Sequence, residues 1–226
     1  MMEYRKARKA ELGEIAVLLT VSFQDYGFFK MYIKNRERQF KFLHSILSTA
    51  VKAYYKKHVI IVGVKDNKIL SVALLKTPDK QELGLMDYVS AGGIMALLIG
   101  GLFNTFGFLK LAQEAGSACH GLPGRVWYLE TLAVSASCQG QGLGSKILEE
   151  GIKPYIEKRG GGLLTLITNT EQNRLFYKKN GFDEFHEMTL ARNGKKIGNW
   201  TWFYILAVLG TAVMWLRLLR RNQKMI

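Results

Sequence analysis

The chain has 226 residues, of which 48% are hydrophobic and 22% charged. This length and composition suit one globular domain with a sizeable core and exclude a low-complexity chain. The formal net charge is +14 and lies at the two ends, because residues 1–60 carry 12 Lys or Arg against 5 Asp or Glu and residues 192–226 carry 7 against none. Such basic ends either attract anionic partners or form solvated surface, and the sequence leaves both interpretations open.

The cysteines and histidines predict neither a disulfide framework nor a metal site. Cys119 and Cys138 are the 2 cysteines, and the 4 histidines are scattered without the spacing of metal ligands. The first residues lack the apolar region of a secretory signal. We therefore expect a cytoplasmic protein that binds no metal.

The first part of the chain alternates between the hydrophobic periods of strands and helices. In chain order the periods predict a short strand, two amphipathic helices and two strands joined by a turn, at residues 4–7, 10–23, 36–54, 59–64 and 69–75. The loop before the second helix, residues 26–32, is rich in aromatic side chains. A long apolar segment then covers residues 83–115. It has too many glycines for a membrane span, and we expect one or two buried helices.

The second part of the chain predicts a strand, a helix, a strand, a helix and a hairpin, at residues 125–135, 142–159, 163–168, 170–179 and 182–206. Pro154 should kink or shorten the first of these helices, because it removes a backbone hydrogen bond. Asn180-Gly181 is typical of a left-handed helix end, and Asn193-Gly194 of a type I′ hairpin turn.

The end of the chain is apolar and then basic. Residues 200–216 carry no charge, and Arg217, Arg220, Arg221 and Lys224 fall on one face of a helix. The hairpin commits the start of this run to a strand, which leaves too few residues to span a membrane. We expect a single domain over residues 1–206 and a basic amphipathic tail over residues 207–226, for which peripheral contact with a membrane stays open.

A glycine-rich loop lies where the central predicted strand turns into a helix. It reads Gln139-Gly140-Gln141-Gly142-Leu143-Gly144-Ser145. Backbone N–H groups at a helix N-terminus bind phosphate oxygens, and glycine lets the anion approach closely. The spacing fits neither dinucleotide-binding nor P-loop motifs, because the third glycine comes one residue early and Ser145 precedes Lys146.

The spacing Gln139-x-x-Gly142-x-Gly144 resembles the pyrophosphate loop of the GNAT superfamily of acetyl-CoA-dependent N-acetyltransferases. Asn173, Tyr177 and Gly181-Phe182 match the second motif of that family. The apolar segment also resembles, in position and pattern, an insertion of the subgroup that includes puromycin N-acetyltransferase. The resemblance implies a mixed, mostly antiparallel twisted sheet of about seven strands flanked by helices, with a V-shaped splay between the central strands.

The same resemblance implies a binding site for acetyl-CoA. The glycine loop would hold the pyrophosphate, the main chain at the end of the central strand would pair with the pantetheine, and Asn173 would position the cofactor or its own helix. The cofactor-binding residues implied are Leu132, Ala133, Val134, Gln139, Gly140, Gln141, Gly142, Leu143, Gly144, Ser145 and Asn173.

Two side chains are candidates for the chemistry. Tyr177 matches the family's general acid, which protonates the departing thiolate; otherwise it packs its helix on the sheet. Glu130 is the candidate base, because a carboxylate on a central strand is costly unless it is paired or functional. Alternation along the strand places Glu130, Leu132 and Val134 on one face.

The resemblance implies transfer of an acetyl group from acetyl-CoA to a primary amine. The aromatic loop and the apolar segment favour a small amphipathic amine as the second partner. Two alternatives stay open, which are a non-enzymatic CoA-binding module of the same fold and an acyltransferase that uses longer acyl chains. We predict no specific nucleic-acid partner, and a homodimer is left open.

Overall fold

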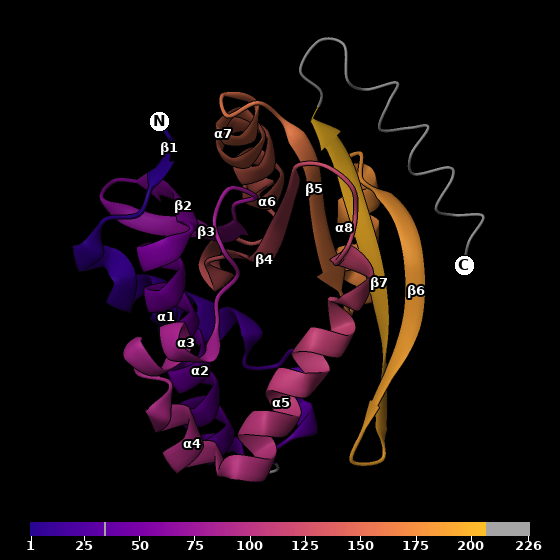
Figure 1. The fold of residues 1–226 in the computed structure, drawn as a ribbon. Helices are drawn as coiled ribbons and strands as arrows, with labels where there is room; N and C mark the ends of the chain where they lie inside the picture. The colour runs from indigo at the N-terminus through magenta and orange to yellow at the C-terminus, as the bar shows by residue number, and fades with distance from the viewer. Residues whose placement is uncertain (34, 207–226) are drawn as a thin grey trace.

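The computed structural model describes residues 1–33 and 35–206, which form one seven-stranded sheet beneath and between helices (Figure 1). The strand order is β1-β2-β3-β4-β5-β7-β6. Only the β4–β5 pair is parallel, so the predicted mixed and mostly antiparallel sheet is confirmed. The strands are β1 (Glu3–Lys6), β2 (Val59–Lys65), β3 (Lys68–Lys76), β4 (Val126–Val134), β5 (Gly162–Thr168), β6 (Asp183–Arg192) and β7 (Lys195–Leu206).

Helices cover both faces of the sheet. On one face α1 (Leu12–Phe23) and α2 (Arg36–Lys57) pack on Ile60, Val62 and Val72. On the other face, Ile61, Ala73 and Trp127 face the helical run that follows the glycine loop. That run comprises α6 (Leu143–Lys146), the π-helical η5 (Ile147–Ile152) and α7 (Lys153–Glu157), and α8 (Glu171–Lys179) lies beside it. Successive apolar residues of a strand therefore point into two different cores, one on each face of the sheet.

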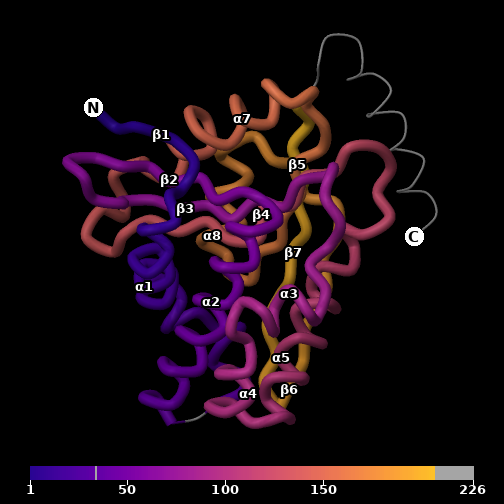
Figure 2. The backbone as a smooth tube through the Cα atoms, turned by 60° about the vertical axis from the view of Figure 1, so that its left-hand side comes forward, coloured from indigo at the N-terminus to yellow at the C-terminus, as the bar shows by residue number. Residues whose placement is uncertain are grey.

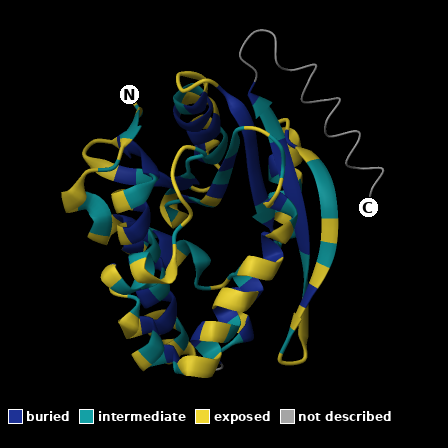
Figure 3. Cartoon of the chain, in the orientation of Figure 1, coloured by how far each residue is buried: buried dark blue, intermediate teal, exposed yellow. Residues whose placement is uncertain are grey.

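The remaining helices are short or belong to the apolar segment. The 3₁₀ helices are η1 (Lys9–Glu11), η2 (Phe29–Met31), η3 (Ser117–Cys119) and η4 (Ala136–Cys138). The apolar segment forms three helices, α3 (Leu85–Ser90), α4 (Ile94–Gly100) and α5 (Leu102–Ala115). The prediction of one or two buried helices here is wrong, because several of their large apolar side chains are exposed to solvent (Figure 3).

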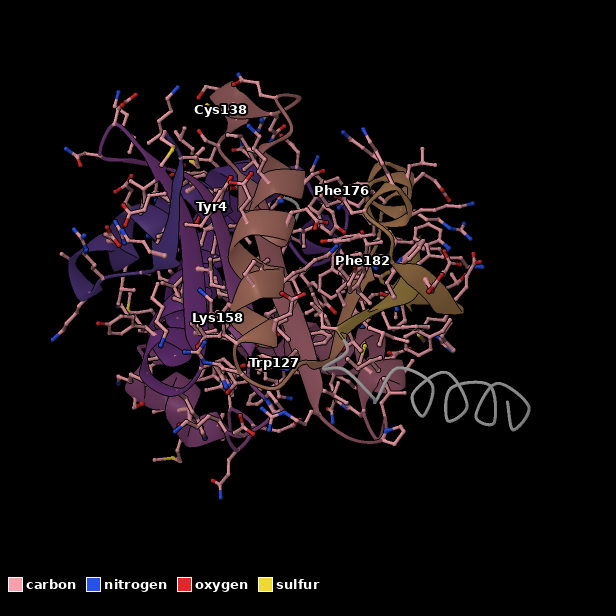
Figure 4. All side chains as sticks on the ribbon, turned by 90° about the horizontal axis from the view of Figure 1, so that it is seen from above. Tyr4, Trp127, Cys138, Lys158, Phe176 and Phe182 are labelled. Carbon is pink, nitrogen blue, oxygen red and sulfur yellow. The ribbon has the colours of Figure 1, made fainter. Side chains whose placement is uncertain are left out.

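Pro154 is accommodated within its helix without a break. The chain stays helical from Leu143 to Glu157, and the turn before Pro154 is π-helical. The N–H of Lys153 donates to the carbonyl of Leu148, five residues earlier. In a π-helical turn the backbone hydrogen bonds span five residues instead of four. Such a turn can accommodate proline, which has no N–H to donate to the helix. Figure 4 shows this helix running from the loop that contains Cys138 toward Lys158.

The strands β4 and β5 diverge soon after they meet. Their parallel pairing covers only Val126–Tyr128 of β4 against Leu163–Thr165 of β5. Beyond it β4 pairs with β3 up to Val134, while β5 pairs with β7 to its end. The edge of β4 that faces β5 is therefore without a strand partner over its last residues, and the predicted splay is confirmed.

Local turn chemistry explains the boundaries around this splay. Asn193 and Gly194 have φ values of 51° and 75°, as the type I′ turn requires. Gly181 has φ 79° and ends α8, with the N–H of Phe182 donating to the carbonyl of Tyr177 at 3.1 Å. The strand β7 runs to Leu206, as the turn predicted, and the predicted tail over residues 207–226 lies outside the described residues.

No single helix in the described ranges 1–33 and 35–206 is long and apolar enough to cross a membrane. The pair α4 and α5 meets the length and composition criterion only when taken together, and the two helices are bent by 117° at the break between them.

The start of α8 generates a first prediction. The hydroxyl of Thr170 accepts from the N–H of Asn173 at 3.2 Å and so caps the helix that carries Tyr177. Thr170→Ala should lower the free energy of unfolding by about 1 kcal/mol, measured by urea denaturation. Thr170→Ser keeps the hydroxyl and should lie close to the wild type, so equal losses in both variants would contradict the cap.

Candidate active site

A cavity of about 260 Å³ opens beside the ends of β4 and β5. Its walls are mainly apolar and come from the aromatic loop after α1, from α2 and from α3–α5. The polar side chains that line it are Tyr26, Thr49, Tyr88, Thr105, Tyr128, Glu130, Thr131, Thr168, Asn169, Asn173 and Tyr177. The cavity therefore brings the two sequence-predicted catalytic candidates, Glu130 and Tyr177, to one space, together with Asn173.

A β-bulge separates the face of Glu130 from the face of Leu132 on β4. In the β3–β4 ladder Leu74 pairs with Thr131 and Leu75 pairs with Leu129, so Glu130 is the extra residue. A bulge reverses the alternation of side chains beyond it. The predicted shared face of Glu130, Leu132 and Val134 is accordingly wrong.

The contacts on either side of the bulge show the reversal. Leu132 packs against the core beneath the helix that follows the glycine loop, and Ala133 packs on the opposite face. Glu130 instead accepts a hydrogen bond from the hydroxyl of Tyr54 of α2, at 2.9 Å. The carboxylate of Glu130 thus lies on the α2 side of the sheet, at the cavity. The side chain of Leu132 lies on the opposite face of the sheet.

The surroundings of Glu130 favour its neutral form. The side chain is exposed to solvent at the cavity, yet protein atoms surround it, and this desolvation raises its pKa above the ordinary value. The hydrogen bond from Tyr54 and the charge of Lys76 lower the pKa and offset part of this effect. Tyr54 itself has its pKa raised well above the ordinary value, by burial and by Glu130, so it remains a donor. Such an environment moves a carboxyl pKa toward the range that a general base needs.

Tyr177 lies on the inner side of α8. The ring is 8% exposed and packs edge-on against Phe176 and Phe182, with centroid distances of 5.1 and 5.4 Å. Tyr177 belongs to the lining of the cavity. Burial raises the pKa of this phenol well above its ordinary value, so the hydroxyl keeps its proton at neutral pH. The ring position is set by packing.

The glycine loop presents a run of free donors. Gly140 and Gly142 both have φ 76°, a conformation that glycine adopts without strain. No backbone carbonyl among the described residues accepts from the N–H groups of residues 139–145. These groups precede a helix, so they form a concave site for an anion.

Gly144 has a packing role in addition. A Cβ at this position would lie 3.1 Å from the ring of Phe176 and 3.9 Å from Val134. The glycine therefore lets α8 approach the loop, which brings the Tyr177 helix and the donor loop together. Figure 4 shows Phe176 and Phe182 on the same side of the helix that starts at this loop.

Sequence reasoning missed the side chains that support the site from a distance. The hydroxyl of Tyr26, in the aromatic loop, accepts from the N–H of Asn169 at 2.9 Å. The amide of Asn169 donates to Asn199 of β7 at 2.9 Å, and Asn199 donates to the carbonyl of Ala115 at 3.0 Å. This chain of bonds joins the aromatic loop, the end of β5, β7 and α5 around the cavity. In the sequence, only the aromatic content of residues 26–32 indicated that this loop contributes to the site.

The described residues contain no cluster of three His, Cys, Asp or Glu side chains that could hold a metal ion. Cys119 is buried and Cys138 partly so, and both thiols are free.

Known proteins that resemble the chain are acetyltransferases. Residues 100–184 match the model of the acetyltransferase (GNAT) domain. An acetyltransferase of Corynebacterium glutamicum, described as histone acetyltransferase HPA2 and related acetyltransferase, superposes with a TM-score of 0.62 at 20% identity, over 88% of this chain and 94% of that one. The chain has the GNAT fold. The puromycin-like subgroup stays a prediction, and no curated protein matches the sequence.

Two further solved structures have the same fold. The polyamine N-acetyltransferase of Drosophila melanogaster superposes with a TM-score of 0.58 at 12% identity, over 91% of this chain and 100% of that one. The mosquito arylalkylamine N-acetyltransferase-like 5b superposes with a TM-score of 0.55 at 17% identity, with coverage of 91% and 100%. At these identities the likeness establishes the arrangement of the sheet and helices and no more.

The environment of Glu130 generates a second prediction, on stability. Because its folded-state pKa is raised, the stability that this group contributes is present at low pH and is lost as pH rises through the folded-state pKa. Glu130→Gln is neutral at every pH and can still accept from Tyr54. Its free energy of unfolding should equal or exceed that of the wild type at pH 8, and the difference should shrink at pH 5.

The matched control is Glu130→Leu, which leaves the buried Tyr54 hydroxyl without its acceptor and should cost about 1–3 kcal/mol. Urea unfolding of the three proteins at both pH values measures these differences. A Gln variant that is less stable than the wild type at pH 8 would mean that the ionised carboxylate is a structural ion, held by favourable contacts.

Proposed function

We propose that the chain transfers an acetyl group from acetyl-CoA to the primary amine of a small amphipathic molecule. The observation that carries the proposal is the juxtaposition of Glu130 and Tyr177 in one cavity at the splay of β4 from β5, next to a loop of free N–H donors. The GNAT fold and the domain match over residues 100–184 support acyl transfer from an acyl-CoA.

The loop and the open edge of β4 suit a CoA molecule. The N–H groups of residues 139–145 would bind the pyrophosphate. The main chain of Leu132, Ala133 and Val134 would pair with the pantetheine amides as an added strand, because β5 has already diverged there. Asn173 lines the cavity beside Tyr177 and would orient the pantetheine end or its own helix. These residues hold and aim the thioester, and no metal is needed for that task.

The chemical steps then divide between two side chains. The carboxylate of Glu130 accepts a proton from the incoming ammonium group, directly or through a water, and the free amine nitrogen forms a bond to the thioester carbonyl carbon. The tetrahedral intermediate collapses as its carbon–sulfur bond breaks, and the hydroxyl of Tyr177 donates its proton to the departing thiolate. The phenolate so formed takes up the remaining surplus proton of the acylated nitrogen, directly or through a water, and Glu130 releases its proton to solvent. The amine is left acetylated and CoA leaves as the thiol. A phenol with a raised pKa is protonated before this step, as a general acid must be.

The cavity indicates the class of acceptor. Among its described lining residues Glu130 is the only charged side chain, and most of the others are apolar or aromatic. An amine on a hydrocarbon or aromatic body fits such walls, whereas a polycation would leave charges unpaired in them. Two structures of the same fold are named for polyamine and arylalkylamine substrates, and the cavity favours the second kind. A longer acyl chain is the alternative occupant of the same apolar walls, and the cytoplasmic location and the homodimer stay predictions.

The loop generates a third prediction, on cofactor affinity. Gln141→Glu keeps the shape of an exposed side chain and adds a negative charge beside the proposed pyrophosphate site. Acetyl-CoA should bind about 5- to 30-fold more weakly by calorimetry, from roughly 1–2 kcal/mol of repulsion between like charges near the surface. The loss should shrink at high salt. The same change at Gln81, exposed in the β3–α3 loop, should leave the affinity unchanged. Equal affinity in the wild type and Gln141→Glu would remove the loop from the site.

The position of Tyr177 generates a fourth prediction, on catalysis. Tyr177→Phe keeps the ring packed against Phe176 and Phe182 and removes only the hydroxyl. The kcat should fall roughly 10- to 1000-fold, the range for one general acid, while the KM for acetyl-CoA changes little. The measurement follows CoA release with an amine acceptor under conditions in which chemistry limits the rate.

The matched control for this variant is Tyr204→Phe, which removes a hydroxyl from a ring that packs on Phe182 outside the cavity lining. It should retain wild-type kcat. Full activity of Tyr177→Phe would exclude the phenol as the acid. A chain that binds acetyl-CoA yet acetylates no amine in a broad acceptor screen would favour the non-enzymatic CoA-binding module.

A further inference from the structure

The helices α3–α5 expose a concentration of large apolar side chains. Of the fifteen large apolar side chains that are exposed among the described residues, nine lie between Leu85 and Leu109. We define the insert patch as six exposed apolar side chains of α4 and of the first half of α5, which are Ile94, Met95, Leu98, Leu102, Phe103 and Phe106. Phe103 is 96% exposed and Leu98 is 71% exposed. Single exposed apolar residues are ordinary, but a contiguous group of this kind marks a binding surface.

The insert patch lies at a sharp corner of the chain. Residues 88–109 include no charged side chain. Gly101 joins α4 to α5 with φ 78°, and the two helices are bent by 117°. Leu102 and Phe103 follow directly after this glycine and so lie at the corner, where Figure 3 shows exposed residues on α4 and α5. An apolar, uncharged corner can enter the interface of a bilayer to a shallow depth without crossing it.

The helix beside the insert patch is strongly basic. α2 has six Lys or Arg residues and one Glu. The guanidinium of Arg38 donates to the carbonyl of Ile99 at 2.8 Å, and the ammonium of Lys56 donates to the carbonyl of Ser90 at 3.3 Å. Lys52 lines the groove between α2 and α4 together with Met95. Cations are therefore held along the side of the apolar corner, the arrangement that suits anionic headgroups above a hydrocarbon layer.

The insert patch is also continuous with the cavity. Phe106 and Leu109 are exposed to solvent and line the cavity as well. Whatever covers the patch therefore lies at the mouth of the cavity.

We propose that the insert patch docks this protein on an anionic phospholipid bilayer, with Leu98, Leu102 and Phe103 in the interface and the cations of α2 against the headgroups. Charge argues for this occupant over a second copy of the chain, because a symmetric contact at the patch would bring the two basic α2 helices close to each other. β7 ends at Leu206, on the side of the molecule away from α4 (Figures 1 and 2).

The test is sedimentation of the full-length protein with vesicles of phosphatidylcholine, with and without phosphatidylglycerol. The wild type should bind the vesicles that contain phosphatidylglycerol, and high salt should weaken this binding. The double variant Leu98→Asp/Phe103→Asp should reduce the fraction bound at least tenfold. Its matched control is Val17→Asp/Leu175→Asp, which introduces the same charges at 53% and 67% exposed side chains of α1 and α8 and should bind as the wild type does.

Charge is tested separately from apolar contact. Lys52→Glu/Lys56→Glu should reduce binding to vesicles with phosphatidylglycerol, while Lys178→Glu/Lys179→Glu on α8 should not. All four substituted pairs are at surface positions, and their urea unfolding curves establish that each variant is folded.

Three outcomes overturn the proposal. The first is a wild type that binds neither kind of vesicle. The second is equal vesicle binding by Leu98→Asp/Phe103→Asp and the wild type, which would assign membrane contact to another surface. The third is a wild-type dimer in sedimentation equilibrium that the same double variant dissociates, without vesicle binding, which would make the patch an interface between copies. The measurement needs no catalysis, so its result is independent of the proposed acetyl transfer.

Discussion

The divergence of β4 from β5 is the constraint on which the rest of the site depends. Three residues of β4 pair with β5, and the strand then follows β3 alone. A buried strand edge without a partner costs free energy, because its N–H and carbonyl groups lose water without gaining a bond. The cavity, the donor loop and α8 all lie around this opening, so the defect in the sheet organises the site.

The bulge at Glu130 is a second irregularity of β4 at the cavity. Trp127 and Leu129 face the core beneath the helix that follows the loop, so alternation places Glu130 on the α2 side, and a regular strand would carry Leu132 there as well. The extra residue reverses the order beyond it, so Leu132 packs in that core while Glu130 accepts from the Tyr54 hydroxyl. The carboxylate is then surrounded by protein atoms but open to the cavity, and desolvation raises its pKa.

The helices α3–α5 combine two properties that a simple core element would not combine. Their inner side chains, such as Leu111 and Ala115, are buried with the aromatic loop, while the outer side chains of α4 and α5 are apolar and exposed. The same helices close the cavity and face outward. Phe106 and Leu109 belong to both surfaces, because they are exposed to solvent and also line the cavity.

The sequence by itself determined the features that depend on neighbours in the chain. Hydrophobic period predicted the strands and most helices, because alternation and the 3.6-residue period are local. Asn193-Gly194 and Gly181 placed a turn and a helix end, since each needs a positive φ. The glycine loop was located by its spacing at a strand-to-helix turn, and the candidate role of Tyr177 rested on the resemblance to a family motif.

Only the tertiary structure decided the features that join distant residues. Glu130 meets Tyr54 across 76 positions, and one bulged residue, which no local pattern marks, moves Leu132 to the opposite face. The bonds from Tyr26 through Asn169 and Asn199 to Ala115 arise because β7 inserts between β5 and β6. The exposure of the apolar segment is of the same kind. Its composition predicted burial, but burial depends on how much surface the neighbouring elements can cover, and around α4 and α5 they leave the outer face open.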